Sequence, residues 1–175
     1  ANLFGEGLAA WSGQLWQLTW REGRVLVWEQ DSFRPLREIS YEGEGWGLTL
    51  GNGMFYMSDG SDLLFIRNPA DFSVTQRVKV CDSGAGVKRL NELEWIAGSI
   101  WANVWRTSRI AIVDPTDGNV RSWLDLSHIV AREAPAGGVL NGIAWDRSSG
   151  EVWVTGKMWS HMYRITGYPG EEKRP

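Results

Sequence analysis

One pattern occurs four times along the chain, and it constrains the fold more than any other feature. The copies open with GEGLAAW, GWGLTL, LNELEW and LNGIAW, starting at Gly5, Gly45, Leu90 and Leu140. They start about 40 to 50 residues apart, which is the period of a β-propeller blade. Within each copy, short segments rich in Val, Ile, Trp and Tyr end at Gly, Pro, Asn or Asp, a pattern typical of antiparallel strands joined by tight turns. The sequence therefore predicts an all-β protein with a β-propeller fold.

The length of 175 residues suits a single domain. We expect about four blade units, then a helical excursion between the third and fourth units, and a tail. The approximate bounds are 5–41, 45–80, 90–124 and 140–166 for the units, 125–137 for the excursion and 167–175 for the tail. The fourth unit offers no outer strand and the first starts near Ala1, which predicts that an N-terminal blade is missing. An unfinished blade exposes a strand edge, so association through that edge is a further expectation.

Composition excludes several classes of protein. A net charge of −3 and a pI near 5.4 argue against nucleic acid as a partner, because there is no basic excess to meet phosphates. No apolar run of about 18 residues exists, so no membrane span is expected. The two histidines lie far apart, Cys81 is the single cysteine, and no Cys, His and Asp cluster occurs at zinc-binding spacing, so no metal site is predicted.

The innermost strands of a propeller line its central channel, so residues that recur at their first positions should form a ring. Those positions hold Glu6, Trp46, Asn91 and Asn141. Trp20, Trp105 and Lys157 follow three of them by similar intervals and should lie at the same end of the channel. Each has a purely structural alternative: indoles pack between sheets, Asn bonds the backbone, and a lone Glu is solvated. Along the third inner strand, Glu92 and Glu94 should face away from Asn91.

Eight motifs, in this order, resemble the glutamine cyclotransferase family of plants and bacteria: FGEGL, QLTW, EGWGLT, MSDGS, LNELEW, ANVW, VLNGIA and VTGK. The resemblance implies a five-bladed propeller that acts as a metal-independent aminoacyltransferase without a cofactor. Its substrates would be peptides with an N-terminal glutamine, which is closed to pyroglutamate with release of ammonia. A secreted or periplasmic location is also implied. One departure is that the family's Phe-Thr-Gln-Gly type motif, carried on an earlier blade, does not precede Ala1.

Carried over residue by residue, the resemblance implies that Glu6 is the catalytic acid and base, with Lys157 and Asn91 as polar groups beside the substrate. Lys157 is predicted to be catalytic as well, because donors from Lys157 and Asn91 could stabilise the oxyanion on the former amide carbon. Trp20, Trp46 and Trp105 would form an aromatic wall, and Phe4 would pack at the channel mouth. Asn141 joins the predicted substrate-binding residues through its place in the repeat. A single carboxylate suffices for the chemistry, because it can take a proton from the attacking amine and deliver one to the departing nitrogen.

Two other readings of the residues stay open. A non-catalytic propeller could bind peptides or carbohydrates on its aromatic ring, although this would not require Glu6 and Lys157 together. A calcium-dependent hydrolase propeller would need more axial Asp, Glu and Asn than this channel offers. Release of ammonia separates the cyclotransferase from both.

Overall fold

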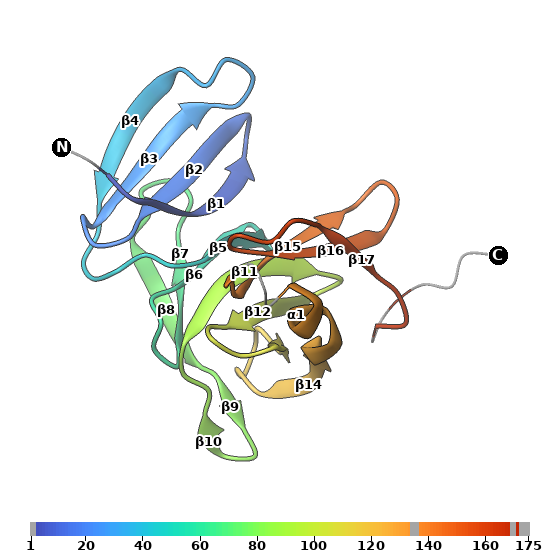
Figure 1. The fold of residues 1–175 in the computed structure, drawn as a ribbon. Helices are drawn as coiled ribbons and strands as arrows, with labels where there is room; N and C mark the ends of the chain where they lie inside the picture. Colours follow the sequence, from blue (N-terminus) through green and yellow to red (C-terminus); the bar gives the residue numbers. More distant parts are fainter. Residues whose placement is uncertain (1–2, 134–136, 169–170, 172–175) are drawn as a thin grey trace.

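The computed structural model describes residues 3–133, 137–168 and 171. Its strands form three four-stranded antiparallel sheets, one three-stranded sheet and one small hairpin, and each sheet is built from consecutive strands (Figure 1). The first sheet comprises β1 (Gly5–Trp11), β2 (Gln14–Thr19), β3 (Arg24–Glu29) and β4 (Pro35–Ser40). The second sheet comprises β5 (Leu48–Gly51), β6 (Met54–Ser58), β7 (Leu63–Arg67) and β8 (Val74–Lys79). The third sheet comprises β11 (Leu90–Ile96), β12 (Ser99–Val104), β13 (Arg109–Val113) and β14 (Val120–Asp125). The fourth sheet comprises β15 (Leu140–Asp146), β16 (Glu151–Gly156) and β17 (Tyr163–Ile165). The prediction of an all-β propeller is confirmed.

The turn between the first two strands of a sheet recurs in the first three sheets. In the second sheet it is Asn52–Gly53, with φ angles of 47° and 73°. Positive φ at both central residues is the mark of a tight hairpin turn whose twist matches that of the strands, and Asn and Gly tolerate it best. Ser12–Gly13 and Ala97–Gly98 adopt the same left-handed geometry. The repeated turn explains why short sequence segments fold back as antiparallel neighbours.

The hydrophobic core lies between neighbouring sheets rather than inside any one of them. Trp16 packs against Phe55 between the first and second sheets, and Tyr56 stacks on Trp95 between the second and third. Trp101 belongs to the cluster between the third and fourth sheets. Burying a side chain of this size contributes about 1.5–3 kcal/mol relative to leaving it exposed. These interfaces therefore fix how the sheets are rotated about the centre.

The innermost strands touch one another in chain order, β1 on β5, β5 on β11 and β11 on β15. Glycine permits close backbone contacts between these strands. A Cβ on Gly7 would collide with the backbone of Gly47 and Leu48, and a Cβ on Gly47 would collide with the carbonyl of Asn91. The Gly7 N–H also donates to the Trp46 carbonyl over 2.8 Å. This backbone contact brings together the residues that precede the two glycines.

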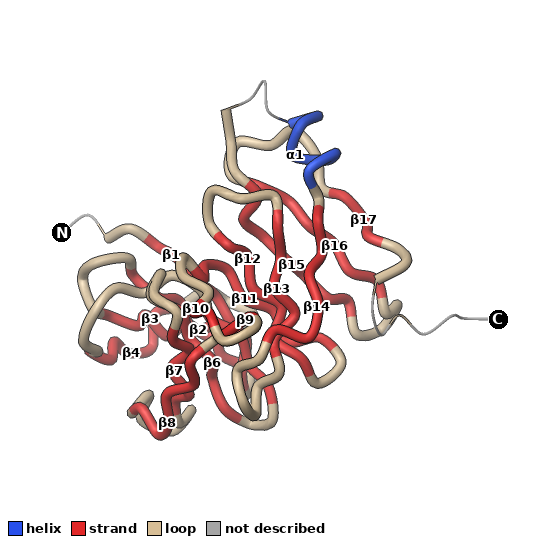
Figure 2. Tube along the Cα trace, turned by 90° about the horizontal axis from the view of Figure 1, so that it is seen from below, coloured by secondary structure: helices blue, strands red, loops and turns tan. Residues whose placement is uncertain are grey.

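The one helix in the described part of the chain, α1 (Ser127–Glu133), lies within the segment expected to leave the blade pattern (Figure 2). Residues 134–136 of that segment, and residues 169–170 and 172–175 of the expected tail, lie outside the described residues. A hairpin that the sequence did not predict, β9 (Cys81–Asp82) and β10 (Ala85–Gly86), projects from the body between the second and third sheets (Figure 1).

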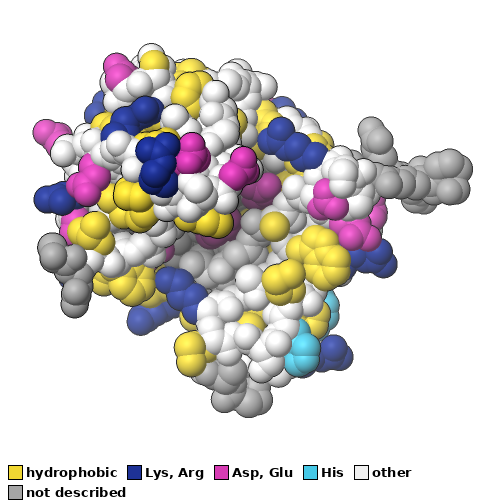
Figure 3. Space-filling model, turned by 90° about the horizontal axis from the view of Figure 1, so that it is seen from above, with side chains coloured by type: hydrophobic (Ala, Val, Ile, Leu, Met, Phe, Trp, Pro, Cys, Tyr) yellow, Lys and Arg dark blue, Asp and Glu magenta, His cyan; other side chains and the backbone are white. Residues whose placement is uncertain are grey.

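Among the described residues, no helix has the length and apolar character that crossing a membrane requires. Basic and acidic side chains are interspersed on the face shown in Figure 3, and neither sign forms a continuous patch there.

Candidate active site

A cavity of about 180 Å³ lies where the innermost strands begin. It is lined by Phe4, Glu6, Trp20, Trp46, Asn91, Trp105 and Lys157. The structure thus gathers seven residues that the sequence placed in one pocket, from all four sheets. The remaining predicted residue, Asn141, does not line this cavity, and its buried Oδ1 has no hydrogen-bond partner in the described part of the chain.

Three of the four innermost strands share a local irregularity at the predicted site residue. Register shifts typical of a β-bulge interrupt three of them, between Gly5 and Leu8, between Leu90 and Leu93, and between Leu140 and Ile143. The predicted site residue is the first inside each bulge: Glu6, Asn91 and Asn141. A bulge adds one residue to one strand and bends it, so it can turn a side chain out of the regular alternation.

Glu6 is the acidic group of the cavity. Its side chain is only 15% exposed, and its Oε1 lies 3.8 Å from the Nζ of Lys157, which is 45% exposed. Burial raises the pKa of the Glu6 carboxyl, and the positive charge of Lys157 opposes part of that rise. A carboxyl with a raised pKa can both accept and return a proton near neutral pH.

Four aromatic rings line the cavity as two edge-to-face pairs. Phe4 and Trp20 lie 5.9 Å apart between ring centroids, and Trp46 and Trp105 lie 5.5 Å apart. Trp46 is backed by Gly60, where a Cβ would collide with the indole ring. Trp105 directly follows β12. The pairs give the pocket rigid apolar walls, because an edge-to-face arrangement places the positive ring edge on a negative ring face.

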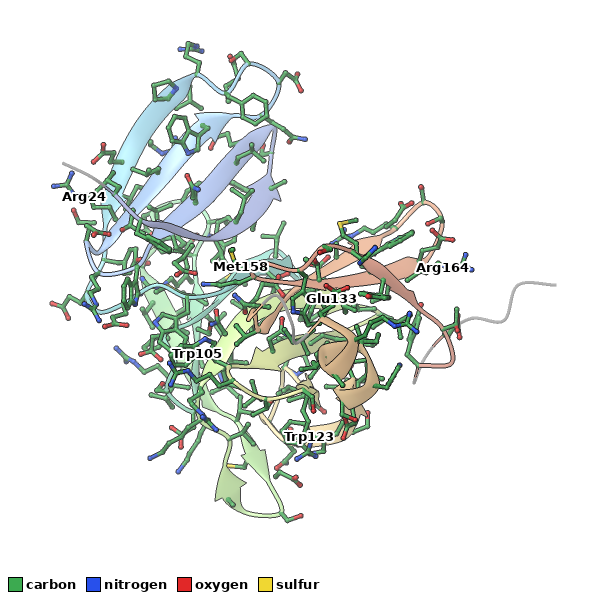
Figure 4. The ribbon with its side chains drawn as sticks, in the orientation of Figure 1. Arg24, Trp105, Trp123, Glu133, Met158 and Arg164 are labelled. Carbon is green, nitrogen blue, oxygen red and sulfur yellow. The ribbon has the colours of Figure 1, made fainter. Side chains whose placement is uncertain are left out.

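Lys157 follows β16 and begins a loop that is anchored by helix α1. The buried Glu133 at the end of α1 accepts hydrogen bonds from the Ser160 N–H over 3.0 Å and from the Tyr163 hydroxyl, and lies 2.9 Å from His161 Nδ1. The Tyr163 hydroxyl is the largest cause of the low pKa of Glu133, about 2. Figure 4 shows Glu133 at the end of α1 beside the fourth sheet. The helix therefore holds the loop that carries Lys157.

Asn91 is buried, and its Oδ1 has no hydrogen-bond partner among the described residues. Its backbone carbonyl is occupied, because it accepts a 2.6 Å hydrogen bond from the Ser58 hydroxyl. A buried acceptor without a partner costs free energy unless a ligand donor reaches it. The side-chain oxygen of Asn91 is therefore suited to an N–H group of a bound molecule.

Sequence reasoning missed Glu44, which does not line the cavity but accepts hydrogen bonds from the indole N–H groups of Trp20 and Trp46. The available signal was its place two residues before Trp46 in the EGWGLT motif. That place in the motif could not reveal the contact with Trp20, because Trp20 lies 24 residues away in the sequence and follows a strand of the first sheet.

Two larger cavities, of about 350 and 330 Å³, lie toward the other end of the inner strands. One surrounds the turn residues 51–53 and 97–98, and the other includes Glu94 and Arg147. Neither combines aromatic walls with a carboxylate and an amine. Within the described residues, no three His, Cys, Asp or Glu side chains are grouped so as to hold a metal ion.

Comparisons with known proteins show which family this chain resembles. Residues 1–166 match a family described as glutamine cyclotransferase. The glutaminyl-peptide cyclotransferase of Arabidopsis thaliana is 34% identical over 167 residues, which is 93% of this chain and 52% of the plant protein. The chain thus spans about half the length of this curated relative.

Solved structures are also similar to this chain. The glutaminyl cyclase of Myxococcus xanthus matches with a TM-score of 0.91 and 37% identity, over 95% of this chain and 73% of that one. The Cps50 (Swd1) β-propeller domain of Myceliophteria thermophila, with a TM-score of 0.56 and 14% identity over 87% of this chain and 49% of that one, is similar in fold alone. The chain belongs to the glutamine cyclotransferase family.

Proposed function

We propose that this chain carries the active site of a glutaminyl-peptide cyclotransferase, which converts the N-terminal glutamine of peptides to pyroglutamate. The observation that supports this most directly is Glu6, a carboxylate of raised pKa that faces an aromatic cavity with an amine 3.8 Å away. The names of the Arabidopsis and Myxococcus relatives support the same reaction.

In the proposed reaction, the α-amine nitrogen of the substrate attacks the carbonyl carbon of its own side-chain amide. Glu6 accepts a proton from the attacking nitrogen as the new C–N bond forms, and the carbonyl π electrons move onto oxygen. Glu6 then delivers that proton to the amide nitrogen. The carbonyl re-forms, the old C–N bond breaks, and ammonia leaves. Atoms and charge balance without an external acid or base.

The other cavity residues have separate roles in this proposal. The ammonium of Lys157 lies close enough to the acid to stabilise negative charge that develops on the amide oxygen. The unpartnered Oδ1 of Asn91 accepts an N–H of the substrate, where the sequence alone had suggested a donor. The ring walls keep water away and hold the flexible glutamine side chain curled toward its own amine.

The test is ammonia release from a Gln-initiated dipeptide by the chain, in the presence of a chelator, with pyroglutamate identified by mass spectrometry. We expect both products from the free peptide. An N-acetylated copy should give neither, because its nitrogen cannot attack. Binding of both peptides without ammonia would contradict the proposal and favour a peptide-binding propeller instead.

A further inference from the structure

A single carboxylate holds together two of the tryptophans that line the cavity. The Oε2 atom of Glu44 accepts a 2.9 Å hydrogen bond from Nε1 of Trp20 and another of 2.9 Å from Nε1 of Trp46. Trp20 follows β2 in the first sheet, whereas Trp46 lies two residues before β5, the first strand of the second sheet. Glu44 therefore connects the two aromatic pairs of the pocket across a boundary between sheets.

The backbone around Glu44 is fixed independently of this carboxylate. The Gly45 N–H donates to the Trp20 carbonyl over 2.9 Å, and the Tyr41 hydroxyl donates to the Thr19 carbonyl over 2.6 Å. A Cβ on Gly45 would collide with that Tyr41 hydroxyl and with the Thr19 carbonyl. The connection between the first two sheets is thus held against the end of β2, so truncating the Glu44 side chain should leave the path of the backbone unchanged.

Glu44 is also held in its charged form. Its Oε1 lies 3.5 Å from Nε of Arg21, whose guanidinium carbon lies 3.8 Å from the ring centroid of Trp20. Hydrogen bonding from Trp46, then from Trp20, and the charge of Arg21 lower the pKa of Glu44 below its usual range. Indole is a donor with no acceptor, so a carboxylate is the strongest partner that a protein can offer both rings at once.

We infer that Glu44 is a positioning residue, which sets the orientation of Trp20 and Trp46 and thereby the shape of the substrate pocket. The inference rests on the proposed function for its kinetic consequence. It is distinct from catalysis, because Glu44 does not line the cavity and Glu6 supplies the acid and base. Losing Glu44 should loosen ring contacts made by the bound substrate and by the transition state alike, so KM should rise while kcat changes little.

The first experiment observes the indole N–H groups of Trp20 and Trp46 by NMR and does not depend on activity. The indole N–H resonances of Trp20 and Trp46 are assigned with Trp20→Phe and Trp46→Phe. In Glu44→Ala both resonances should shift, and their exchange with solvent should accelerate at least tenfold. Glu44→Gln keeps an acceptor oxygen and should stay close to wild type, and Glu42→Ala, which removes an exposed carboxylate two residues earlier, should match wild type. If Glu44→Ala does not fold, Glu44→Met replaces it with a side chain of similar length.

The second experiment measures KM and kcat for the same variants with a Gln-initiated dipeptide. We expect KM of Glu44→Ala to rise about tenfold with kcat within about threefold, and Glu44→Gln to restore most of the loss. In a Trp46→Phe background, which lacks one of the two N–H groups, the effect of Glu44→Ala should be smaller.

The outcomes separate the two proposals. Unchanged indole resonances in Glu44→Ala overturn the positioning role whatever the activity. Shifted resonances with wild-type KM and kcat overturn it as well. Absence of turnover in the wild-type chain contradicts the proposed function, while the resonances still decide whether Glu44 orients the rings.

Discussion

Two partly buried carboxylates on the innermost strands occupy adjacent positions of the same repeated bulge, yet their surroundings differ. Glu6 is the first bulge residue of β1 and faces the cavity, with Lys157 at 3.8 Å. Glu92 is the second bulge residue of β11, and its charged neighbour is Glu94. Its carboxyl accepts a hydrogen bond from the Ile143 backbone, whereas its buried Oε2 has no hydrogen-bond partner among the described residues. Burial raises the pKa of both carboxyls, most strongly that of Glu92.

The difference shows that a raised pKa does not by itself identify a catalytic acid. Glu6 has space beside it for a substrate and a cation to balance its ionised form. Glu92 does not line that cavity and forms no ion pair with the described residues, and the nearby acidic Glu94 makes its ionisation still less favourable. We therefore expect Glu6 to determine activity and Glu92 to affect stability.

The largest effect is expected from Glu6→Gln. The amide cannot accept the proton of the attacking amine, so kcat should fall by about 10²- to 10⁴-fold. The thermal midpoint should stay within a few degrees of wild type, because the new side chain is the same size. Ammonia release and a thermal melt measure the two effects. Glu92→Gln is the matched control, and a comparable loss of kcat in that variant would remove the distinction between the two sites.

Lys157→Met should lower kcat by about tenfold to a hundredfold, because a donor to the developing oxyanion is lost. The pH profile gives a second signature. Lys157 lowers the pKa of Glu6, so without it burial raises that pKa further. Glu6 must be ionised to act as a base, and the acidic limb of kcat/KM should therefore move to higher pH. Lys88→Met, at an exposed lysine that does not line the cavity, is the control. An acidic limb that stays in place would mean that Lys157 does not act on Glu6.

Glu92→Gln should change how stability depends on pH. The native state keeps the Glu92 proton from the ordinary pKa of 4.5 up to the raised pKa, whereas the unfolded chain has released it. Over that window the native state binds more protons, so its contribution to stability is present at low pH and is lost as pH rises. Each unit of pKa difference corresponds to about 1.4 kcal/mol.

The measurement for Glu92 is the free energy of unfolding by urea at several pH values above 4.5. Glu92→Gln retains an acceptor for the Ile143 amide and should remove this part of the decline, so that it is more stable than wild type at the upper end of the window. Identical slopes for the two proteins would show that Glu92 ionises freely.

The smallest effect is expected from Asn141→Ala. Asn141 occupies the same bulge position as Glu6 and Asn91 but does not line the cavity. We expect kcat/KM to stay within about threefold of wild type, whereas Asn91→Ala should lower it clearly. A large loss in Asn141→Ala would mean that the place in the repeat matters more than contact with the cavity.

The repeat predicted the fold and most of the pocket because both follow from position along the chain. Glu6, Trp46 and Asn91 share a place in their copies, and equivalent places in a propeller meet at the axis. The role of Glu44 could not be read in this way, because it depends on two indoles from different sheets approaching one carboxylate. The β9–β10 hairpin also escaped prediction, since its two-residue strands are too short to show any periodicity.

The β9–β10 hairpin offers a place at which the chain could be split into two fragments. Its tip, Ser83–Gly84, is exposed and projects from the body between the second and third sheets (Figure 1). A chain split there yields one fragment that carries Glu6 and Trp46 and another that carries Asn91 and Lys157. Neither fragment has a complete pocket, and they would rejoin through the core between the second and third sheets. Fused to two partners that associate, such halves would report the encounter by restored turnover.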